Sequence, residues 1–227
     1  MDSQTQDGKC IAGLVLICAQ CALAASPSNP SVRFDDATQA LGLAVTGESA
    51  CWADFDNDGW VDLCAGGSVW RNVSGKHFTK FTPADFGRAI AADFDNDGFT
   101  DLFSFSQMKL WRNDGHGGFT EVALPPLPKT VARGACWADF NGDGFVDLYI
   151  GGYEDWDANL TYPSLVLTNA GGKRFSLAHT DRRYRARGVS ACDFNRDGYM
   201  DVYVSNYRLM PNLLLLGNPQ HELILLR

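Results

Sequence analysis

The sequence has too few basic residues for a typical nucleic-acid-binding protein. It contains 19 Lys and Arg against 27 Asp and Glu, a formal net charge of −8, whereas a surface that binds phosphate backbones is normally basic. It also lacks the run of about 20 apolar residues that a membrane-spanning helix needs, because its longest apolar stretch, at 10–25, is interrupted by Gln20. We therefore expect no nucleic-acid partner, and no membrane span once the N-terminal segment has been removed.

Recognisable catalytic motifs are missing as well. The chain has no GxSxG, no HExxH, no Walker loop and no GxGxxG after a strand. Its histidines are scattered over different segments, as His77, His116, His179 and His221. The sequence therefore predicts a protein that is not an enzyme and has no catalytic residues.

The N-terminal segment is typical of a secretory signal peptide. Lys9 precedes the apolar stretch, which ends in the small-residue site Ala22-Leu23-Ala24. We expect residues 1–25 to be the signal peptide and 26–31 a linker, so that the protein is secreted, periplasmic or extracellular. An uncleaved anchor and an untranslocated apolar tail are the alternatives.

Four cysteines lie outside this segment: Cys51, Cys64, Cys136 and Cys192. In an exported chain they permit two disulfides with three connectivities. The alternative is four buried thiols on strands, and the sequence does not choose between the two. None of the four belongs to a CxxC pair, which argues against a zinc site.

An acidic nine-residue phrase occurs four times and organises the rest of the chain. It reads DFDNDGWVD at 54–62, DFDNDGFTD at 93–101, DFNGDGFVD at 139–147 and DFNRDGYMD at 193–201. Its starts are 39, 46 and 54 residues apart, the period of a propeller blade. A short apolar run precedes each phrase, and an alternating run rich in β-branched and aromatic residues follows it.

Two further strands follow in each unit, at 69–72 and 77–81 in the first. The sequence therefore predicts an all-β fold, a β-propeller with four four-stranded blades in residues 32–227. The expected units are about 44–82, 83–125, 126–180 and 181–227. An extra outer strand is expected at 32–37, and both a small ring and an incomplete arc of a larger propeller are open.

The phrase also has the composition of a calcium-binding loop. Oxygen-bearing side chains stand at positions 1, 3, 5 and 9, a backbone carbonyl is available at position 7, and glycine at position 6 is expected to allow a sharp turn that a side chain would obstruct. Mg²⁺ would resist so dehydrated a site, and softer metals favour nitrogen or sulfur. The predicted Ca²⁺ ligands are Asp54, Asp56, Asp58, Trp60 and Asp62; Asp93, Asp95, Asp97, Phe99 and Asp101; Asp139, Asn141, Asp143, Phe145 and Asp147; and Asp193, Asn195, Asp197, Tyr199 and Asp201.

Two alternative interpretations fit the sequence less well. An EF-hand needs Glu at position 12 and flanking helices, but position 12 is Ala65, Ser104, Ile150 and Val204, all in predicted strands. Simple acidic turns would not need the same spacing four times. Because Asn141 and Asn195 replace carboxylates, the third and fourth loops are expected to bind Ca²⁺ more weakly.

The pattern D-x-[DN]-x-D-G-x-x-D, followed by an apolar strand and an x-N-x-G-x-F segment, resembles the FG-GAP/VCBS repeat. The segment at 34–43 and the WRN motifs are most similar to the cartilage-acidic-protein-like, ASPIC/UnbV-associated group of these repeats. The resemblance covers residues 32–218. It implies a calcium-stabilised propeller, related to those of integrin α-subunits, that serves in adhesion or partner binding.

A partner surface is expected on the face opposite the metal loops, where the insertion at 153–163 and the basic run at 181–187 would meet. Aromatic residues and arginines are enriched at binding hot spots, and on an acidic protein they would suit an acidic protein or glycan. The predicted partner-binding residues are Tyr153, Trp156, Tyr162, Arg182, Arg183, Tyr184, Arg185 and Arg187. The alternative is a solvated loop with scattered arginines.

The sequence thus predicts an exported, non-enzymatic, calcium-binding propeller for adhesion or for binding a protein or glycan. A fragment or subunit of a larger assembly, which would self-associate, is one alternative. A polysaccharide-acting enzyme is another.

Overall fold

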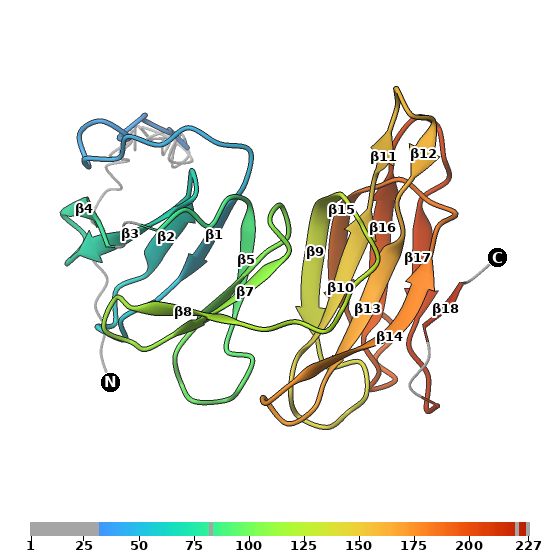
Figure 1. The fold of residues 1–227 in the computed structure, drawn as a ribbon. Coiled ribbons are helices and arrows are strands. Elements are labelled where there is room, and N and C mark those ends of the chain that lie inside the picture. The colour runs from blue at the N-terminus through green and yellow to red at the C-terminus, as the bar shows by residue number, and fades with distance from the viewer. Residues whose placement is uncertain (1–31, 82–83, 221–222, 226–227) are drawn as a thin grey trace, which may run out of the picture. The chain divides into compact units, whose positions relative to one another are not determined.

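The computed structural model describes residues 32–81, 84–220 and 223–225 (Figure 1). Residues 37–227 form one compact unit, separate from the segment that precedes it. The predicted signal peptide at 1–25 and the linker at 26–31 lie outside the described residues. Within the described part of the chain, no helix has the length and apolar character to cross a membrane.

Four antiparallel sheets of four strands each make up the fold, and we number them as blades 1 to 4. Blade 1 contains β1 (Ala50–Ala53), β2 (Asp62–Ala65), β3 (Ser68–Val73) and β4 (His77–Lys80). Blade 2 contains β5 (Ala89–Ala92), β6 (Asp101–Ser104), β7 (Lys109–Asn113) and β8 (Phe119–Val122). Blade 3 contains β9 (Ala132–Ala138), β10 (Asp147–Gly152), β13 (Ser164–Asn169) and β14 (Phe175–Asp181). Blade 4 contains β15 (Ala186–Cys192), β16 (Asp201–Asn206), β17 (Leu213–Leu216) and β18 (Ile224–Leu225).

Within each blade the strands pair in the order in which the chain forms them, so every blade is an up-and-down meander. Four such sheets are the arrangement of a four-blade β-propeller. The predicted all-β propeller is therefore confirmed. The strands of each blade fall within one predicted unit, except that β14 ends one residue later, at Asp181.

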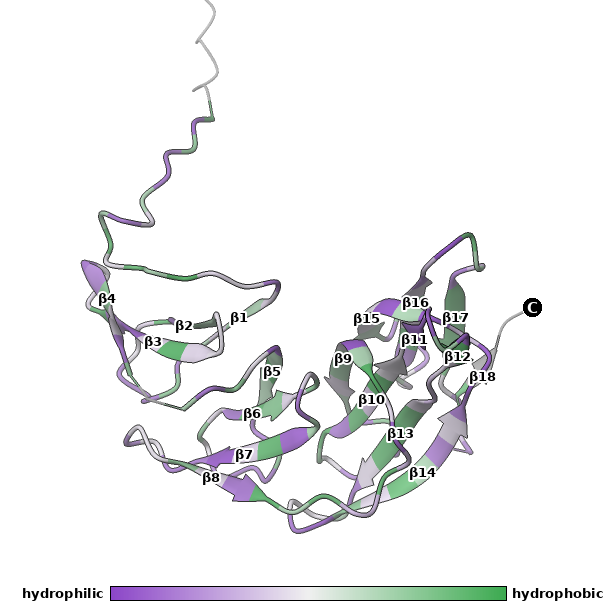
Figure 2. Cartoon of the chain, turned by 45° about the horizontal axis from the view of Figure 1, so that its top comes forward, coloured by the Kyte–Doolittle hydropathy of each residue, from purple (hydrophilic) through white to green (hydrophobic). Residues whose placement is uncertain are grey.

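Burial explains the different sequence patterns of the strands. The second strand of blades 1 to 3 is buried along its whole length. Blades 2 and 3 each have a neighbouring blade on both sides. Figure 2 shows green, the colour of hydrophobic residues, along part of β10 and of β13. One apolar cluster joins Phe103 and Leu110 of blade 2 to Leu148 and Leu165 of blade 3. Similar clusters join blade 1 to blade 2 and blade 3 to blade 4.

The phenylalanine at position 2 of the phrase forms much of the contact between blades. Phe55 is fully buried and packs edge-on against Phe119 of the next blade, with ring centroids 6.2 Å apart. Phe94 is also buried and packs against Phe175 of the following blade in a tilted arrangement, with ring centroids 5.8 Å apart. In blade 4 the equivalent Phe194 is 53% exposed.

In blades 2 and 3, an asparagine at the end of the third strand is hydrogen-bonded to the preceding blade. The Nδ2 of Asn113 donates to the carbonyl of Phe55 at 2.7 Å. Asn169 donates to the carbonyl of Phe94, also at 2.7 Å. These bonds are buried, so they hold the backbones of successive blades in a fixed register.

Two segments differ from the sequence predictions. Residues 32–37 form no strand; Val32 and Phe34 are 83% and 92% exposed, so their alternating pattern has no sheet to join. The outer strand β4 is therefore not paired with residues 32–37. It forms one hydrogen bond to the segment before β1, in which the amide of Phe78 donates to the carbonyl of Leu41 at 2.7 Å. The insertion at 153–163 folds into a short hairpin of β11 (Glu154–Asp155) and β12 (Leu160–Thr161).

The four cysteines outside the N-terminal segment are free thiols. Cys51 and Cys64 face each other across β1 and β2. Cys64 and Cys136 are buried and Cys51 is half-buried, but Cys192 is exposed. The alternative of four buried thiols therefore fails at Cys192.

The bond between blades predicts a difference between two equivalent asparagines. Asn72 of blade 1 forms two hydrogen bonds within its own blade, with Val61 and Gly75. Asn113 forms the two equivalent bonds in blade 2, with Thr100 and Gly115. Asn113 also makes the buried bond to Phe55. We expect Asn113→Ala to lower the free energy of unfolding by about 1–3 kcal/mol more than Asn72→Ala, measured by urea denaturation. Equal losses would show that the bond between blades contributes nothing.

Candidate metal centres

The aspartate at position 1 of each phrase shapes the loop through backbone N–H groups. Asp54 accepts the amides of Asp58 at 3.2 Å and Gly59 at 2.8 Å on its two carboxylate oxygens. The aspartate at position 5 then accepts the amide of the residue at position 7, at 2.9 Å from Asp58 to Trp60. The same bonds recur in blades 2, 3 and 4, at 2.8 to 3.2 Å. The four loops therefore share one shape.

Glycine at position 6 is required by the backbone and not by lack of space. Gly59, Gly98, Gly144 and Gly198 have φ between 86° and 91°, and a Cβ on any of them would meet no atom within 4 Å. The prediction that a side chain would obstruct the turn is therefore wrong. Glycine is needed here because L-residues disfavour this left-handed backbone conformation. Position 4 is also left-handed, and asparagine tolerates it with φ near 55° in blades 1 and 2.

The aspartate at position 9 is buried and joins the loop to the third strand. Asp62 accepts the amide of Phe55 at 3.0 Å on one oxygen and the amide of Asn72 at 2.7 Å on the other. Equivalent bonds occur in the other three blades. Burial raises the pKa of Asp101 to about 7 and that of Asp147 to about 6, because the N–H donors only partly offset the loss of hydration.

Two of the loops bring three carboxylates within reach of one ion. Asp54, Asp56 and Asp58 each place an oxygen within 4.8 Å of the others, and so do Asp93, Asp95 and Asp101. In both loops the Oδ1 of the position-3 aspartate, Asp56 or Asp95, is buried and accepts no hydrogen bond. A buried, unpaired carboxylate oxygen in an oxygen-only donor set fits a hard cation such as Ca²⁺.

The other two loops carry asparagine at position 3. Asn141 accepts the amide of Asp143 at 2.9 Å, and Asn195 that of Asp197 at 3.1 Å. At position 7, Trp60, Phe99, Phe145 and Tyr199 all contribute a backbone N–H to the loop. Their carbonyl groups stay predicted ligands.

Two arginines beside the first two loops were missed by the sequence analysis. Arg71 on β3 forms ion pairs with Asp56 at 2.6 Å and Asp58 at 2.9 Å. Arg112 on β7 pairs with Asp95 and Asp97 at 2.8 and 2.9 Å. These carboxylates raise the pKa of both guanidinium groups. The repeated W-R-N motif was the signal that would have found them.

The predicted partner residues separate into two groups. Around the β11–β12 hairpin, Arg185 pairs with Glu154 at 3.1 Å, and Arg187 stacks on Tyr207 at 4.0 Å from the ring centroid. Arg208, which was not predicted, also pairs with Glu154 and lies 3.6 Å from the ring centroid of Trp156. We call Trp156, Arg185, Arg187, Tyr207 and Arg208 the aromatic–arginine surface.

The remaining predicted residues lie elsewhere or are buried. Tyr153 and Tyr162 are 8% and 6% exposed, so they support the hairpin from beneath. Arg183 is held by Asp181 at 2.6 Å and lies over the ring of Tyr184, and Arg182 is exposed. Sequence spacing did not reveal the ion pairs of these arginines. Their acidic partners are Glu154, which lies in the β11–β12 hairpin, and Asp181, at the end of β14.

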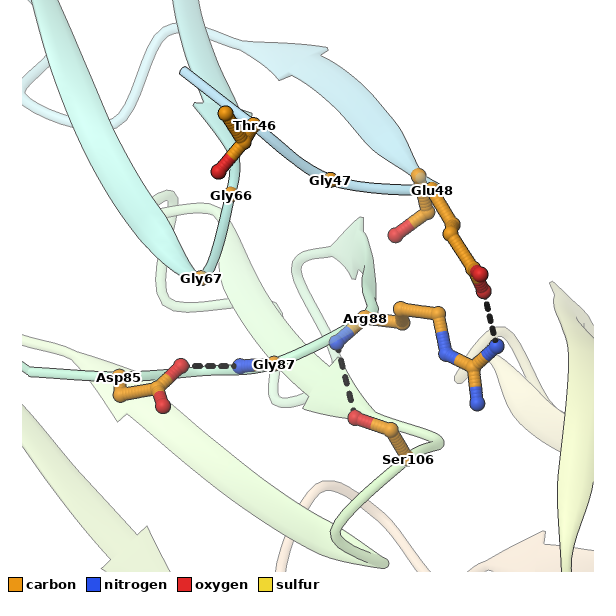
Figure 3. A pocket seen from close by; sticks show the side chains of 10 residues that line it. Thr46, Gly47, Glu48, Gly66, Gly67, Asp85, Gly87, Arg88 and Ser106 are labelled. Carbon is orange, nitrogen blue, oxygen red and sulfur yellow. Dashed lines mark hydrogen bonds and ion pairs between the residues drawn. The ribbon is translucent and has the colours of Figure 1, made fainter. Parts of the chain in front are cut away.

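A shallow polar hollow lies between blades 1 and 2, lined by the turns at 46–49, 66–67 and 85–88 and by Ser106 (Figure 3). Arg88 spans it, with its amide bonded to Ser106 at 2.8 Å and its guanidinium to Glu48 at 2.8 Å. The charges of Arg88 and Glu48 are thus paired, and the carboxylate of Asp85 accepts the amide of Gly87 at 2.9 Å.

Comparison with known proteins agrees with this geometry. The model of the family described as FG-GAP-like repeat matches residues 93–150, which include the second and third loops. The search of curated proteins finds no match to the chain.

The backbone explanation for glycine at position 6 predicts different outcomes two residues apart in one loop. Gly144→Ala should lower the free energy of unfolding by about 1–2 kcal/mol, because φ is 86° there. Gly142→Asn should change it by less than about 0.5 kcal/mol, because Asn57 and Asn96 occupy the same position in blades 1 and 2. Both effects should persist in chelator during urea denaturation; equal losses would contradict the explanation.

Proposed function

Because this chain is an FG-GAP repeat protein with a four-blade propeller, we propose that it is a non-enzymatic, calcium-binding scaffold that binds a protein or glycan partner. The observation that carries the calcium role is the pair of buried, unpaired carboxylate oxygens, on Asp56 and Asp95, each inside a loop of oxygen donors. Aspartate or asparagine at positions 1, 3 and 5 of each loop would hold one ion.

Charge explains what the ion would do for the fold. Fourteen of the 27 acidic residues lie in the four phrases, where like charges repel one another. An ion that binds only the folded loops would relieve this repulsion and stabilise the folded state. Most of these carboxylates are already bonded to backbone N–H groups, which supports a structural role and not a catalytic one.

The aromatic–arginine surface is the proposed partner site. Trp156 is 61% exposed. The arginines beside it carry more positive charge than the single Glu154 can balance, and the side chain of Glu154 is only 5% exposed. Arginine and exposed tryptophan suit an acidic protein or glycan. The apolar N-terminal segment supports export of the protein, and adhesion outside the cell would follow from both features.

Self-association is a second candidate, favoured by one observation. Phe55, Phe94 and Phe140 are at most 9% exposed because a following blade covers them, but Phe194 is 53% exposed. An exposed blade face of this kind would suit another propeller blade.

Removal of the ion tests the calcium role. We expect excess Ca²⁺ to raise the melting temperature of the full chain and EDTA to lower it, since ligand at 100 times its dissociation constant adds about 2.7 kcal/mol of stability per site. Mg²⁺ should substitute poorly. Melting should be followed by circular dichroism and binding by calorimetry. Identical melting in Ca²⁺ and EDTA, with no heat of binding, would refute the calcium role.

Capture on heparin- and polyglutamate-coated sensors tests the partner site. Trp156→Ala and Arg208→Ala should each weaken capture by about tenfold, and rising salt should weaken it further. Arg183→Ala is the matched control, because its guanidinium pairs with Asp181 outside this surface. Absence of capture, or an equal loss in the control, would reject this site.

A further inference from the structure

Near the end of the third strand, an arginine occurs only in the blades whose loops carry the additional carboxylate. The position is defined by the residue after it, whose amide donates to the position-9 aspartate in every blade at 2.7 to 3.0 Å. The preceding residues are therefore equivalent: Arg71, Arg112, Thr168 and Leu216. Position 3 of the phrase is, in the same order, Asp56, Asp95, Asn141 and Asn195.

This pairing gives the first three sites the same formal charge. Loops 1 and 2 have four carboxylates and one guanidinium, and loop 3 has three carboxylates and no arginine at that position, so each of these sites carries a formal charge of −3. Loop 4 has three carboxylates and Arg196 at position 4, which gives a formal charge of −2. In loop 4 the neutral amide of Asn195 donates to the Oδ2 of Asp197 at 2.8 Å. In loop 1 the Oδ2 of the equivalent Asp58 is bound by Arg71 at 2.9 Å.

The arginines add positive charge beside the loops, but they do not determine the backbone conformation of the loops. The backbone bonds to the aspartates at positions 1, 5 and 9 are the same in the loops with an arginine at that strand position and in those without one. Removal of the guanidinium should therefore leave the loop folded. Its main effect should be on the electrostatic potential at the site.

The guanidinium and an ion would contact opposite oxygens of one carboxylate. Arg71 pairs with the Oδ2 of Asp56, and Arg112 with the Oδ2 of Asp95. The Oδ1 of each aspartate is buried without a partner, and the side chains are only 8% and 9% exposed. The arginine thus leaves a ligand oxygen available while it offsets part of the negative charge.

We propose that Arg71 and Arg112 are built-in counter-ions that match the calcium affinities of sites 1 and 2 to that of site 3. The inference rests on the proposed calcium-binding function. For loop 3 it replaces the expectation of weaker binding, because the additional aspartate of loops 1 and 2 is balanced by an arginine. Sites 1, 2 and 3 would then fill over the same range of Ca²⁺ concentration.

A double-mutant cycle in loop 1 tests the proposal, with the arrangement of blade 3 as its template. Arg71→Thr should tighten ion binding at this site roughly tenfold, and Asp56→Asn should weaken it roughly tenfold. The double variant Asp56→Asn/Arg71→Thr should return to within about threefold of the wild type. In EDTA, Arg71→Thr should melt at a lower temperature than the wild type, because four carboxylates then lack their counter-ion.

The tryptophan at position 7 provides a readout for this loop. Tb³⁺, used as the Ca²⁺ analogue in titrations of the full chain, should luminesce on excitation of Trp60, and Trp60→Phe identifies the part of the signal that comes from loop 1. Unchanged or weaker binding in Arg71→Thr would overturn the proposal, and so would a double variant that binds like Asp56→Asn. If Arg71→Thr does not fold, the cycle of Arg112→Thr and Asp95→Asn, read by Ca²⁺ calorimetry, decides. No binding of either ion to the wild type would instead refute the calcium role itself.

Discussion

A buried aspartate at the end of each phrase is the residue on which the rest of each blade depends. Asp62, Asp101, Asp147 and Asp201 are at most 1% exposed, and each accepts one amide from the loop and one from the third strand. The carboxylate therefore fixes the loop against the sheet and sets the register of the third strand. In blades 2 and 3 the asparagine held in this way also binds the preceding blade, through the carbonyl of Phe55 or Phe94. One side chain thus links loop shape, strand pairing and packing between blades.

Burying that carboxylate beside other acids is unfavourable unless positive charge is near. Loss of hydration and neighbouring aspartates raise the pKa of Asp62, Asp101 and Asp147, so near neutral pH their ionised forms reduce the stability of the fold. Backbone N–H groups offset only part of this cost. Arginine in blades 1 and 2 offsets a further part, and a divalent ion is the remaining source of positive charge that the oxygen donors suit.

The repeat made the fold predictable, because each copy encodes its own hairpin through local alternation and a left-handed turn. The strand predicted at 32–37 was wrong because alternation alone does not supply a neighbouring strand. Arg71 and Arg112 were missed because their carboxylate partners lie 13 and 15 residues earlier, across a strand. The aromatic–arginine surface was predicted in part: the sequence identified Trp156 and the arginines at 185 and 187, but Glu154 and Arg208 join them only through folding of the β11–β12 hairpin.

Direct bonds between neighbouring loops explain why matched sites would matter. Asn57 of loop 1 donates to the carbonyl of Gly98 in loop 2 at 2.9 Å, and Asn96 of loop 2 donates to that of Gly144 in loop 3 at 3.0 Å. An ion that stabilised one loop would therefore also stabilise the donor or acceptor used by the next loop. If the sites differed strongly in affinity, some of these bonds would join a loop that holds an ion to a loop that does not. Sites of equal charge in loops 1, 2 and 3 would instead let these loops bind their ions together, as the proposed scaffold would require to hold its partner surface in one conformation.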